Sequence, residues 1–219
     1  MTTSSRFMHR TLRWLGMLAL PYAAAHADGL TDLATFLRTT QQGQASFTQT
    51  VTAPQKDGAA APRSKTSSGT FEFQRPSRFR FQYTQPFAQT IVADGQQLWL
   101  FDADLNQATV RRQQDVLGNT PAALIAAAPD LRGLHSVFTL SNAPDADGQQ
   151  WVRATPKGKD GQLQSMQLGF KQGQLATLEM LDSFGQRSVL RFGPMNLQPG
   201  FGSGHFVFEP PPGADVVRQ

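Results

Sequence analysis

The sequence predicts a mainly β protein with some α-helix, an incomplete antiparallel β-barrel of about 10 to 11 strands covered by a lid of short helices. Over most of the chain, apolar side chains alternate with polar ones at a period of two, which places them on one face of a strand. Two segments depart from this alternation and have the apolar pattern of helices. Short strands at close spacing favour a curled sheet, and helices with an apolar surface need an apolar surface to cover.

The segment 1–27 has the pattern of a cleavable secretory signal. It contains three arginines and no acidic residue, then an apolar run over 14–20, then small residues up to Ala27. The run is too short to span a bilayer, and Pro21 interrupts it. We therefore expect cleavage before Asp28, export from the cytoplasm, and one domain over 28–219.

The charge of the chain changes when this segment is set aside. The whole sequence has a net charge of +4, with 20 basic and 16 acidic residues. Removing the three arginines leaves 17 basic against 16 acidic residues. Nucleic-acid binding needs a clustered basic face, so no nucleic-acid partner is expected. The absence of cysteine excludes disulfides, thiol catalysis and the acylated cysteine of an exported lipoprotein.

The first mature element is an amphipathic helix over Gly29–Gln42, because its leucines and phenylalanine recur at helical spacing and Gly43 follows as a stop. A long mobile hairpin loop is expected over Thr52–Gly69, which is rich in Ala, Pro, Lys, Ser and Gly. Segments of strand pattern are Ala45–Val51, Phe71–Phe73, Phe79–Tyr83, Ile91–Val92, Leu98–Phe101, Gln107–Arg111, Val137–Leu140, Trp151–Thr155, Leu163–Phe170, Leu175–Leu181, Arg187–Phe192 and His205–Phe208.

A second helix is expected in the break between the strands. Thr120 is its cap and Pro121 lies in its first turn. It continues over Ala122–Ala128, and a short further helical turn is expected around Asp130–Leu134. The helix is small and apolar nearly all round, so it should lie against an apolar surface. With the first helix it would cover an open side of the sheet.

The sequence contains no motif for catalysis, nucleotide binding or metal binding. His135 and His205 are isolated in sequence, and the pairs Asp102/Asp104 and Asp145/Asp147 lie in turn contexts. The patterns GxxxxGK[ST], GxSxG and HExxH do not occur. We expect a protein that is not an enzyme and takes no cofactor.

Phenylalanine dominates the aromatic residues. The chain after residue 27 holds 15 of the 16 phenylalanines but only one tyrosine, Tyr83. Two interpretations are open at this point. The rings either fill an ordinary core, or they line an apolar cavity inside the curved sheet.

Several stretches together resemble the LolA family of periplasmic outer-membrane lipoprotein carriers. They run in order through essentially all of 28–219. The stretches are Ala45-Ser-Phe-Thr-Gln, Arg75-Pro76 followed by Phe79-Arg-Phe81 and Thr84-Gln-Pro86, Asp94-Gly95 with Leu98-Trp99, Gly118-Asn-Thr-Pro-Ala-Ala-Leu-Ile-Ala126, and Phe206-Val-Phe-Glu-Pro-Pro-Pro-Gly213.

This resemblance implies a function. A member of the family takes lipoproteins from the inner-membrane ABC transporter LolCDE, shields their acyl chains in a hydrophobic cavity, and delivers them to the outer-membrane receptor LolB. Because LolB is itself a lipoprotein, the missing cysteine places this chain with the carriers. The resemblance implies a monomer located in the periplasm. The alternative is a periplasmic sensor or other lipid shuttle with the same fold.

The resemblance also implies roles for particular residues. Arg75 matches the arginine that bonds to backbone carbonyls of the lid and favours the closed state. The expected lining residues could each belong instead to an ordinary core. They are Phe79, Phe81 and Tyr83 on the wall, Leu33 and Leu37 on the first helix, and Leu124, Ile125 and Ala126 on the second. The long loop before Gly69 departs from the family pattern.

Overall fold

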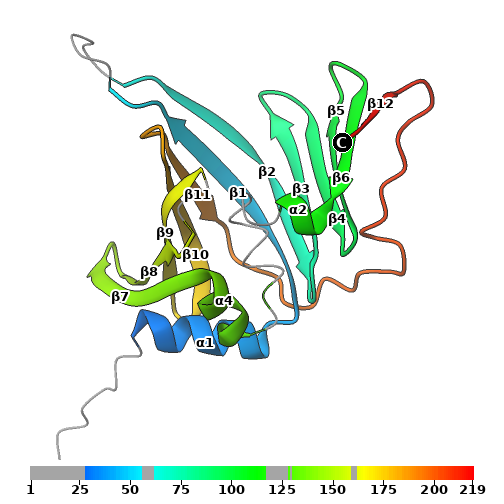
Figure 1. Ribbon diagram of the computed structural model, residues 1–219. Coiled ribbons are helices and arrows are strands. Elements are labelled where there is room, and N and C mark those ends of the chain that lie inside the picture. Colours follow the sequence, from blue (N-terminus) through cyan, green and yellow to red (C-terminus); the bar gives the residue numbers. More distant parts are fainter. Residues whose placement is uncertain (1–27, 56–61, 117–127, 129, 159–161) are drawn as a thin grey trace, which may run out of the picture.

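The computed structural model describes residues 28–55, 62–116, 128, 130–158 and 162–219. Its strands form one sheet of 12 strands, in the order β12-β6-β5-β4-β3-β2-β1-β11-β10-β9-β8-β7 (Figure 1). All neighbouring strands are antiparallel except β12 and β6, which are parallel. The strands are β1 Gln42–Thr52, β2 Ser64–Gln74, β3 Arg78–Gln85, β4 Gln89–Asp94, β5 Gln97–Asp102, β6 Gln107–Arg112, β7 Phe138–Ala146, β8 Gln149–Pro156, β9 Leu163–Lys171, β10 Gln174–Asp182, β11 Arg187–Phe192 and β12 Asp215–Arg218.

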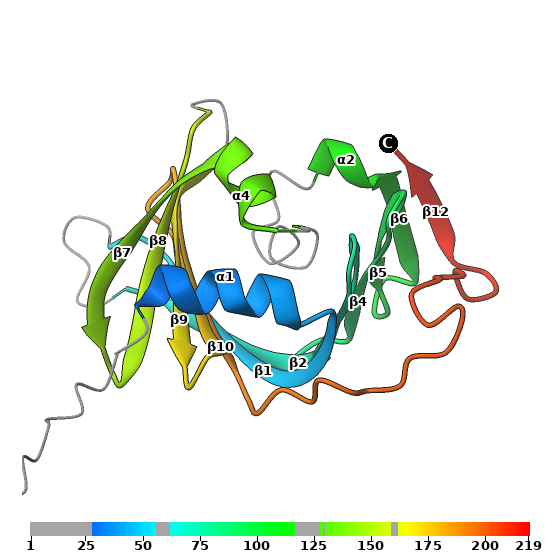
Figure 2. The same cartoon turned by 90° about the horizontal axis from the view of Figure 1, so that it is seen from below.

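The sheet curls into a half-barrel that does not close (Figure 2). Its two ends are β7 and β12, which lie on opposite walls. The predicted fold class, mainly β with an incomplete barrel and short helices, is confirmed, although the described residues form 12 strands where about 10 to 11 were expected. Among the described residues, every helix is too short or too polar to cross a bilayer.

Three helices are described, α1 Gly29–Thr39, α2 Gln113–Val116 and α4 Leu131–Val137. The carboxylate of Asp28 caps α1 by accepting a hydrogen bond of 2.8 Å from the Thr31 N–H. The helix ends three residues earlier than expected because Gln42 already pairs with β2. It lies across one end of the half-barrel, with α4 on the concave side (Figure 2).

The concave face carries two rows of apolar side chains close to α1. We call them the phenylalanine rows, and strand register aligns their members. One is Gly43, Phe73, Phe79, Ala93 and Leu98, and the other is Ala45, Phe71, Phe81, Ile91 and Leu100. The rings of Phe71 and Phe81 stack with 4.5 Å between centroids. From α1, the ring of Phe36 packs against those of Phe73 and Phe170 at 6.2 and 5.9 Å. The main core therefore lies between α1 and the concave face.

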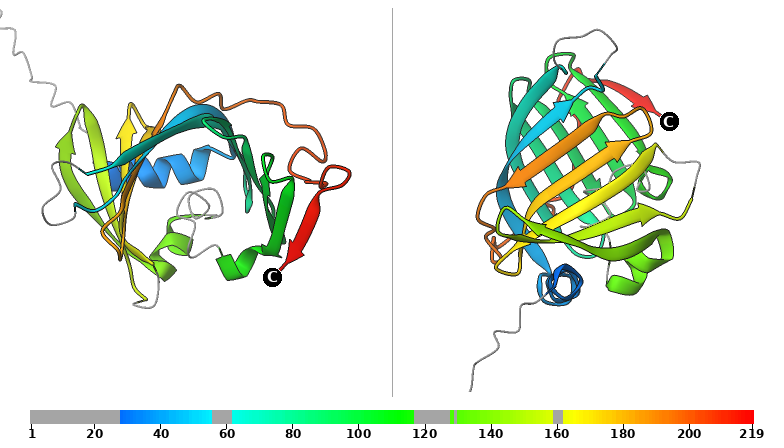
Figure 3. Two further views of the ribbon diagram at one scale, coloured as in Figure 1. Left: turned by 90° about the horizontal axis from the view of Figure 1, so that it is seen from above. Right: turned by 90° about the vertical axis from the view of Figure 1, so that its left-hand side faces the viewer.

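The segment 193–214 crosses the convex face of the sheet (Figure 3). Phe206 is buried in it, and Phe208 packs on Trp99 with 5.6 Å between ring centroids. The prediction of a strand at His205–Phe208 was wrong, since residues 203–206 form a turn and the rings pack on the face of the sheet. The C-terminal strand is instead β12, which the sequence analysis did not anticipate.

The hairpin loop between β1 and β2 is shorter than expected. Thr52 and Ser64 are already paired, so the connection covers 53–63, of which 56–61 lie outside the described residues. Alternating Ser, Thr and Lys hid the strand here because apolar residues are missing. Gly69 sits at a bulge in β2, where a Cβ atom would come 1.9 Å from the Gln82 carbonyl oxygen. A side chain at this position would force β2 and β3 apart.

Two further expectations concern segments around the break in the sheet. The helical turn expected at Asp130–Leu134 is confirmed as α4, and the Asp130 carboxylate accepts a hydrogen bond of 2.9 Å from the Gly133 N–H. Val137 ends that helix instead of beginning a strand. The helix expected over Ala122–Ala128 lies outside the described residues except for Ala128, and so does the signal over 1–27.

Candidate functional site

Arg75 lies between β2 and β3 and is 7% exposed. Its Nε donates a hydrogen bond of 2.9 Å to the carbonyl oxygen of Thr40, the residue that follows α1. Its Nη1 donates a bond of 2.6 Å to the carbonyl oxygen of Ala128, shortly before α4. One side chain therefore joins the sheet to the end of α1 and to the segment that leads into α4.

The surroundings of the Arg75 guanidinium are apolar. Its central carbon lies 5.6 Å from the centroid of the Phe36 ring and 5.3 Å from that of Phe73. Burial lowers the pKa of Arg75 to about 10, so the group stays protonated at neutral pH. Since both hydrogen-bond acceptors are backbone carbonyls, these bonds depend on where the two segments lie rather than on their side chains.

The three expected wall residues follow one another on the concave side of β3. Phe79 and Phe81 are buried within the phenylalanine rows. Tyr83 is half-buried, and its hydroxyl donates a hydrogen bond of 2.8 Å to Oε1 of Gln49. Burial raises the pKa of Tyr83 to about 12. Tyr83 therefore marks the point where the concave face changes from apolar to polar.

The expected residues of α1 face the same core. Leu33 and Leu37 are buried and belong to one apolar cluster with Phe79 and Phe81. Leu124, Ile125 and Ala126 lie outside the described residues. In this conformation the described side chains pack on one another, and their exposure to a bound lipid stays a prediction.

Sequence reasoning missed several residues of this region. Phe36 could have been included, since it shares the apolar stripe of α1 with Leu33 and Leu37. Gln49 and Ser188 could not, because they are 139 positions apart and carry no motif. Their side chains meet across β1 and β11, where Gln49 Nε2 donates a hydrogen bond of 2.8 Å to Ser188 Oγ.

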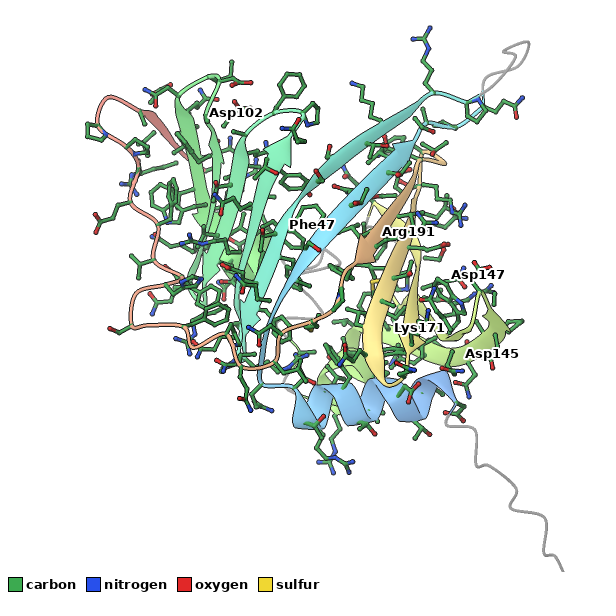
Figure 4. The ribbon with its side chains drawn as sticks, turned by 180° about the vertical axis from the view of Figure 1, so that it is seen from behind. Phe47, Asp102, Asp145, Asp147, Lys171 and Arg191 are labelled. Carbon is green, nitrogen blue, oxygen red and sulfur yellow. The ribbon has the colours of Figure 1, made fainter. Side chains whose placement is uncertain are left out.

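Of the carboxylates considered as metal ligands, Asp102 serves a turn, and Asp145 lies within β7 instead of in a turn. Asp102 Oδ1 accepts bonds of 3.1 Å from the backbone N–H groups of Asp104 and Leu105. Figure 4 shows Asp102 far from Asp145 and Asp147, which lie together on another wall. Within the part of the chain that the structure describes, no group of three or more His, Cys, Asp or Glu side chains could hold a metal ion.

Comparison with known proteins agrees with the architecture. Residues 38–209 match the family model described as outer membrane lipoprotein carrier protein LolA. The chain belongs to the LolA family. The resemblance found in the sequence is thereby confirmed.

Similar proteins cover nearly the whole of this LolA-family chain. A protein of Albidiferax ferrireducens named outer-membrane lipoprotein carrier protein is 62% identical over 89% of this chain and 93% of its own length. A protein of the same name from Methylibium petroleiphilum is 48% identical over 97% of this chain and 100% of its own. A crystal structure of an uncharacterized conserved protein from Thermus thermophilus has the same fold, with a TM-score of 0.51, 13% identity, and coverage of 86% of this chain and 96% of that one.

Proposed function

We propose that this LolA-family chain is a periplasmic chaperone for lipoproteins. It receives them from the inner-membrane ABC transporter LolCDE, shields their acyl chains on its concave face, and delivers them to the outer-membrane receptor LolB. It acts as a monomer and as a carrier rather than an enzyme. The energy for loading comes from the transporter, since no nucleotide motif occurs in this sequence.

The observation that supports the proposal best is the link that Arg75 makes between the sheet and two covering segments. Three acyl chains of roughly 15 methylenes each would cost on the order of 36 kcal/mol to leave in water, at about 0.8 kcal/mol per methylene. A carrier must cover most of that area and later expose it. Phe36 of α1 packs on Phe73 of the phenylalanine rows, and Arg75 holds the end of α1 and Ala128 through bonds that can break without loss of the sheet.

The substitution Arg75→Leu tests this link. Without the two hydrogen bonds the closed, empty state is less stable, so release of cargo becomes less favourable. We expect Arg75→Leu to load lipoprotein but to pass it to LolB at least tenfold more slowly, since even one bond from a charged donor contributes about 1.5 kcal/mol or more. The measurement is transfer from loaded carrier to LolB in a reconstituted assay.

Arg153→Leu is the matched control, because Arg153 is an exposed arginine on β8. It should transfer at the rate of the unaltered protein. Unchanged transfer by Arg75→Leu would contradict the proposed role of Arg75.

A second experiment tests recognition of the acyl chains. The purified monomer should bind an acylated lipoprotein and leave its unacylated form unbound. Equal binding of both forms would remove the acyl-shielding role. Mass spectrometry of ligand that co-purifies from the periplasm would separate the alternatives: triacylated peptide supports a lipoprotein carrier, and free glycolipid favours another lipid shuttle.

A further inference from the structure

The concave face changes character with distance from α1. Phe47 follows Ala45 on the concave side of β1 and packs on Phe81. Beyond it and beyond the phenylalanine rows, the concave positions on six strands are mostly polar. We call this set the polar row: Gln49, Ser67, Tyr83, Gln89, Asp102 and Ser188. Strand register places Gln49 opposite Ser67, and Gln89 opposite both Tyr83 and Asp102. These side chains therefore form a band across the end of the sheet that is remote from α1.

Three members of the polar row form a hydrogen-bonded chain. The Tyr83 hydroxyl donates to Gln49 Oε1, and Gln49 Nε2 donates to Ser188 Oγ, both at 2.8 Å. The chain has a direction, because Ser188 Oγ accepts and its hydroxyl proton can be donated onward. Gln49 Nε2 has a second N–H to donate, since an amide nitrogen carries two. Both groups therefore present donors to a ligand on the concave face.

A hollow lies on each side of this chain. The first has a volume of about 260 Å³ and is lined by Gln49 and Ser188 together with the apolar side chains of Val51, Leu163 and Met180. It has room for about nine water molecules at 30 Å³ each. Hydrogen-bond donors on one side and apolar carbon on the other suit a small neutral group of mixed polarity.

The second hollow, of about 380 Å³, is lined by Tyr83, Ser67 and Gln89 and by the exposed Phe87 and Leu105. It continues the polar row toward β5. Both hollows open at the end of the concave face where the phenylalanine rows stop. A ligand with long apolar chains on those rows would place its polar end here.

We propose that the polar row binds the glyceryl-cysteine head group of the lipoprotein, with Gln49 and Ser188 donating hydrogen bonds to its ester and amide carbonyls. The inference rests on the proposed function, because the head group reaches this row only if the acyl chains lie on the phenylalanine rows. Each acyl chain begins at a carbonyl oxygen. A carbonyl that is buried without a donor costs about 1 to 3 kcal/mol, so a cavity with apolar walls alone would bind this head group poorly.

The charged groups beside the hollows fit a neutral ligand. Asp182 Oδ1 accepts hydrogen bonds from the backbone N–H groups of Phe184 and Gln186, and Asp102 Oδ1 accepts from those of its own turn. An N-acylated cysteine carries no positive charge at its nitrogen and so needs no carboxylate. Hydroxyl and amide groups thus provide the recognition.

Two probes and one substitution test the proposal. The first probe is a synthetic tripalmitoylated S-glyceryl-cysteine peptide, and the second is its uncharged analogue with three hexadecyl chains joined through ether links, in which oxygen replaces the cysteine nitrogen and no carbonyl remains on the chains. Gln49→Met removes both hydrogen bonds of the side chain at similar volume. We expect it to weaken binding of the first probe about tenfold and to leave binding of the second unchanged. Thr48→Val, on the same strand but on the convex face, should change neither.

Each other outcome decides against the proposal. Loss of affinity for both probes in equal measure would mean that Gln49 only supports the fold, and no loss for either would mean that it does not touch the head group. Ser188→Ala is a smaller change that should act in the same direction if Gln49→Met unfolds the protein. If the unaltered protein binds neither probe, the proposed function fails as well, which distinguishes that result from failure of the head-group site alone.

Discussion

The described residues include two segments that cover the sheet, and these covers are attached in different ways. The concave face is covered by α1, through buried apolar side chains and through the bond from Arg75 to the Thr40 carbonyl. The convex face is covered by the segment 193–214, where the side chains of His205 and Glu72 pair at 2.7 Å. Arg80 Nη2 adds a hydrogen bond of 2.6 Å to the His205 carbonyl oxygen.

The two covers differ in whether a bound lipid could replace the contacts that hold them. The convex cover is held at its start by the backbone pairing of Asn196 with Gln44 and at its end by β12 on β6. The contacts of α1 are mainly contacts of one apolar surface with another, and acyl chains can provide the same contacts. We therefore expect the concave cover to move during transport and the convex cover to stay in place.

The largest expected effect compares one buried phenylalanine from each cover. Phe36→Ala and Phe206→Ala should each lower the free energy of unfolding by about 3 kcal/mol, as is usual when a buried ring is removed. Denaturant unfolding measures this loss. Of the two, Phe36→Ala alone should also change the rate of lipoprotein transfer, because Phe36 packs on Phe73 of the phenylalanine rows and Phe206 lies on the convex face.

Val207→Ala is the control for the convex cover, since Val207 is 56% exposed. It should change the free energy of unfolding by less than about 0.5 kcal/mol. A transfer defect in folded Phe206→Ala as large as that in Phe36→Ala would show that both covers take part in transport.

A smaller effect is expected at the polar attachment of the convex cover. His205→Ala removes the partner of Glu72, which keeps a hydrogen bond of 2.7 Å from Gln44 Nε2. The free energy of unfolding should fall by about 1 kcal/mol, with no change in transfer. Unfolding and transfer assays on the same preparation measure both quantities, and a slower transfer would weaken the distinction between the covers.

The smallest effect at neutral pH concerns Tyr83. Its pKa of about 12 lies above the ordinary value of 10, so the folded protein holds more protons between these values. This contribution to stability is complete below pH 10 and is lost as the pH rises toward 12. Arg75, whose pKa is lowered to about 10, acts in the opposite direction over this range.

The contribution of Tyr83 to the pH dependence of stability is therefore measured as the difference between the unaltered protein and Tyr83→Phe. The free energy of unfolding should fall more steeply from pH 9 to 11 in the unaltered protein than in Tyr83→Phe, in which Arg75 is unchanged. In the chain after residue 27, absorbance at 295 nm follows Tyr83, the single tyrosine there. Parallel stability curves would show that Tyr83 ionises as easily in the folded state as in the unfolded one.

Much of the fold could be predicted because local pattern determines it. The alternation of Phe79, Phe81 and Tyr83 with polar neighbours predicts a strand with one apolar face, and this prediction does not depend on which strand it pairs with. The Asp130 cap gives α4 for the same local reason. β12 was missed because its four residues are stabilised by pairing with β6, more than 100 positions earlier in the chain.

The candidate site likewise has residues that the local sequence predicts and contacts that only the folded chain reveals. Arg75 was found through the motif around it, but its acceptors among the described residues, Thr40 and Ala128, are known only from the folded chain. The Gln49–Ser188 contact depends on β1 lying beside β11, which no local pattern indicates. Residue identities predict the apolar wall, and the pairing of distant strands creates the polar row.

The seam between β1 and β11 also has a consequence for the order of folding. Phe47 pairs with Phe192, 145 residues later, and this seam joins the strands β2 to β6 with the strands β7 to β10. Closing so long a loop is slow, because its entropy is lost before the contacts form. Each half can assemble from neighbouring strands, but the concave face exists only when the seam closes. A chain that is still emerging, with β11 not yet present, would therefore have no complete surface on which to hold cargo.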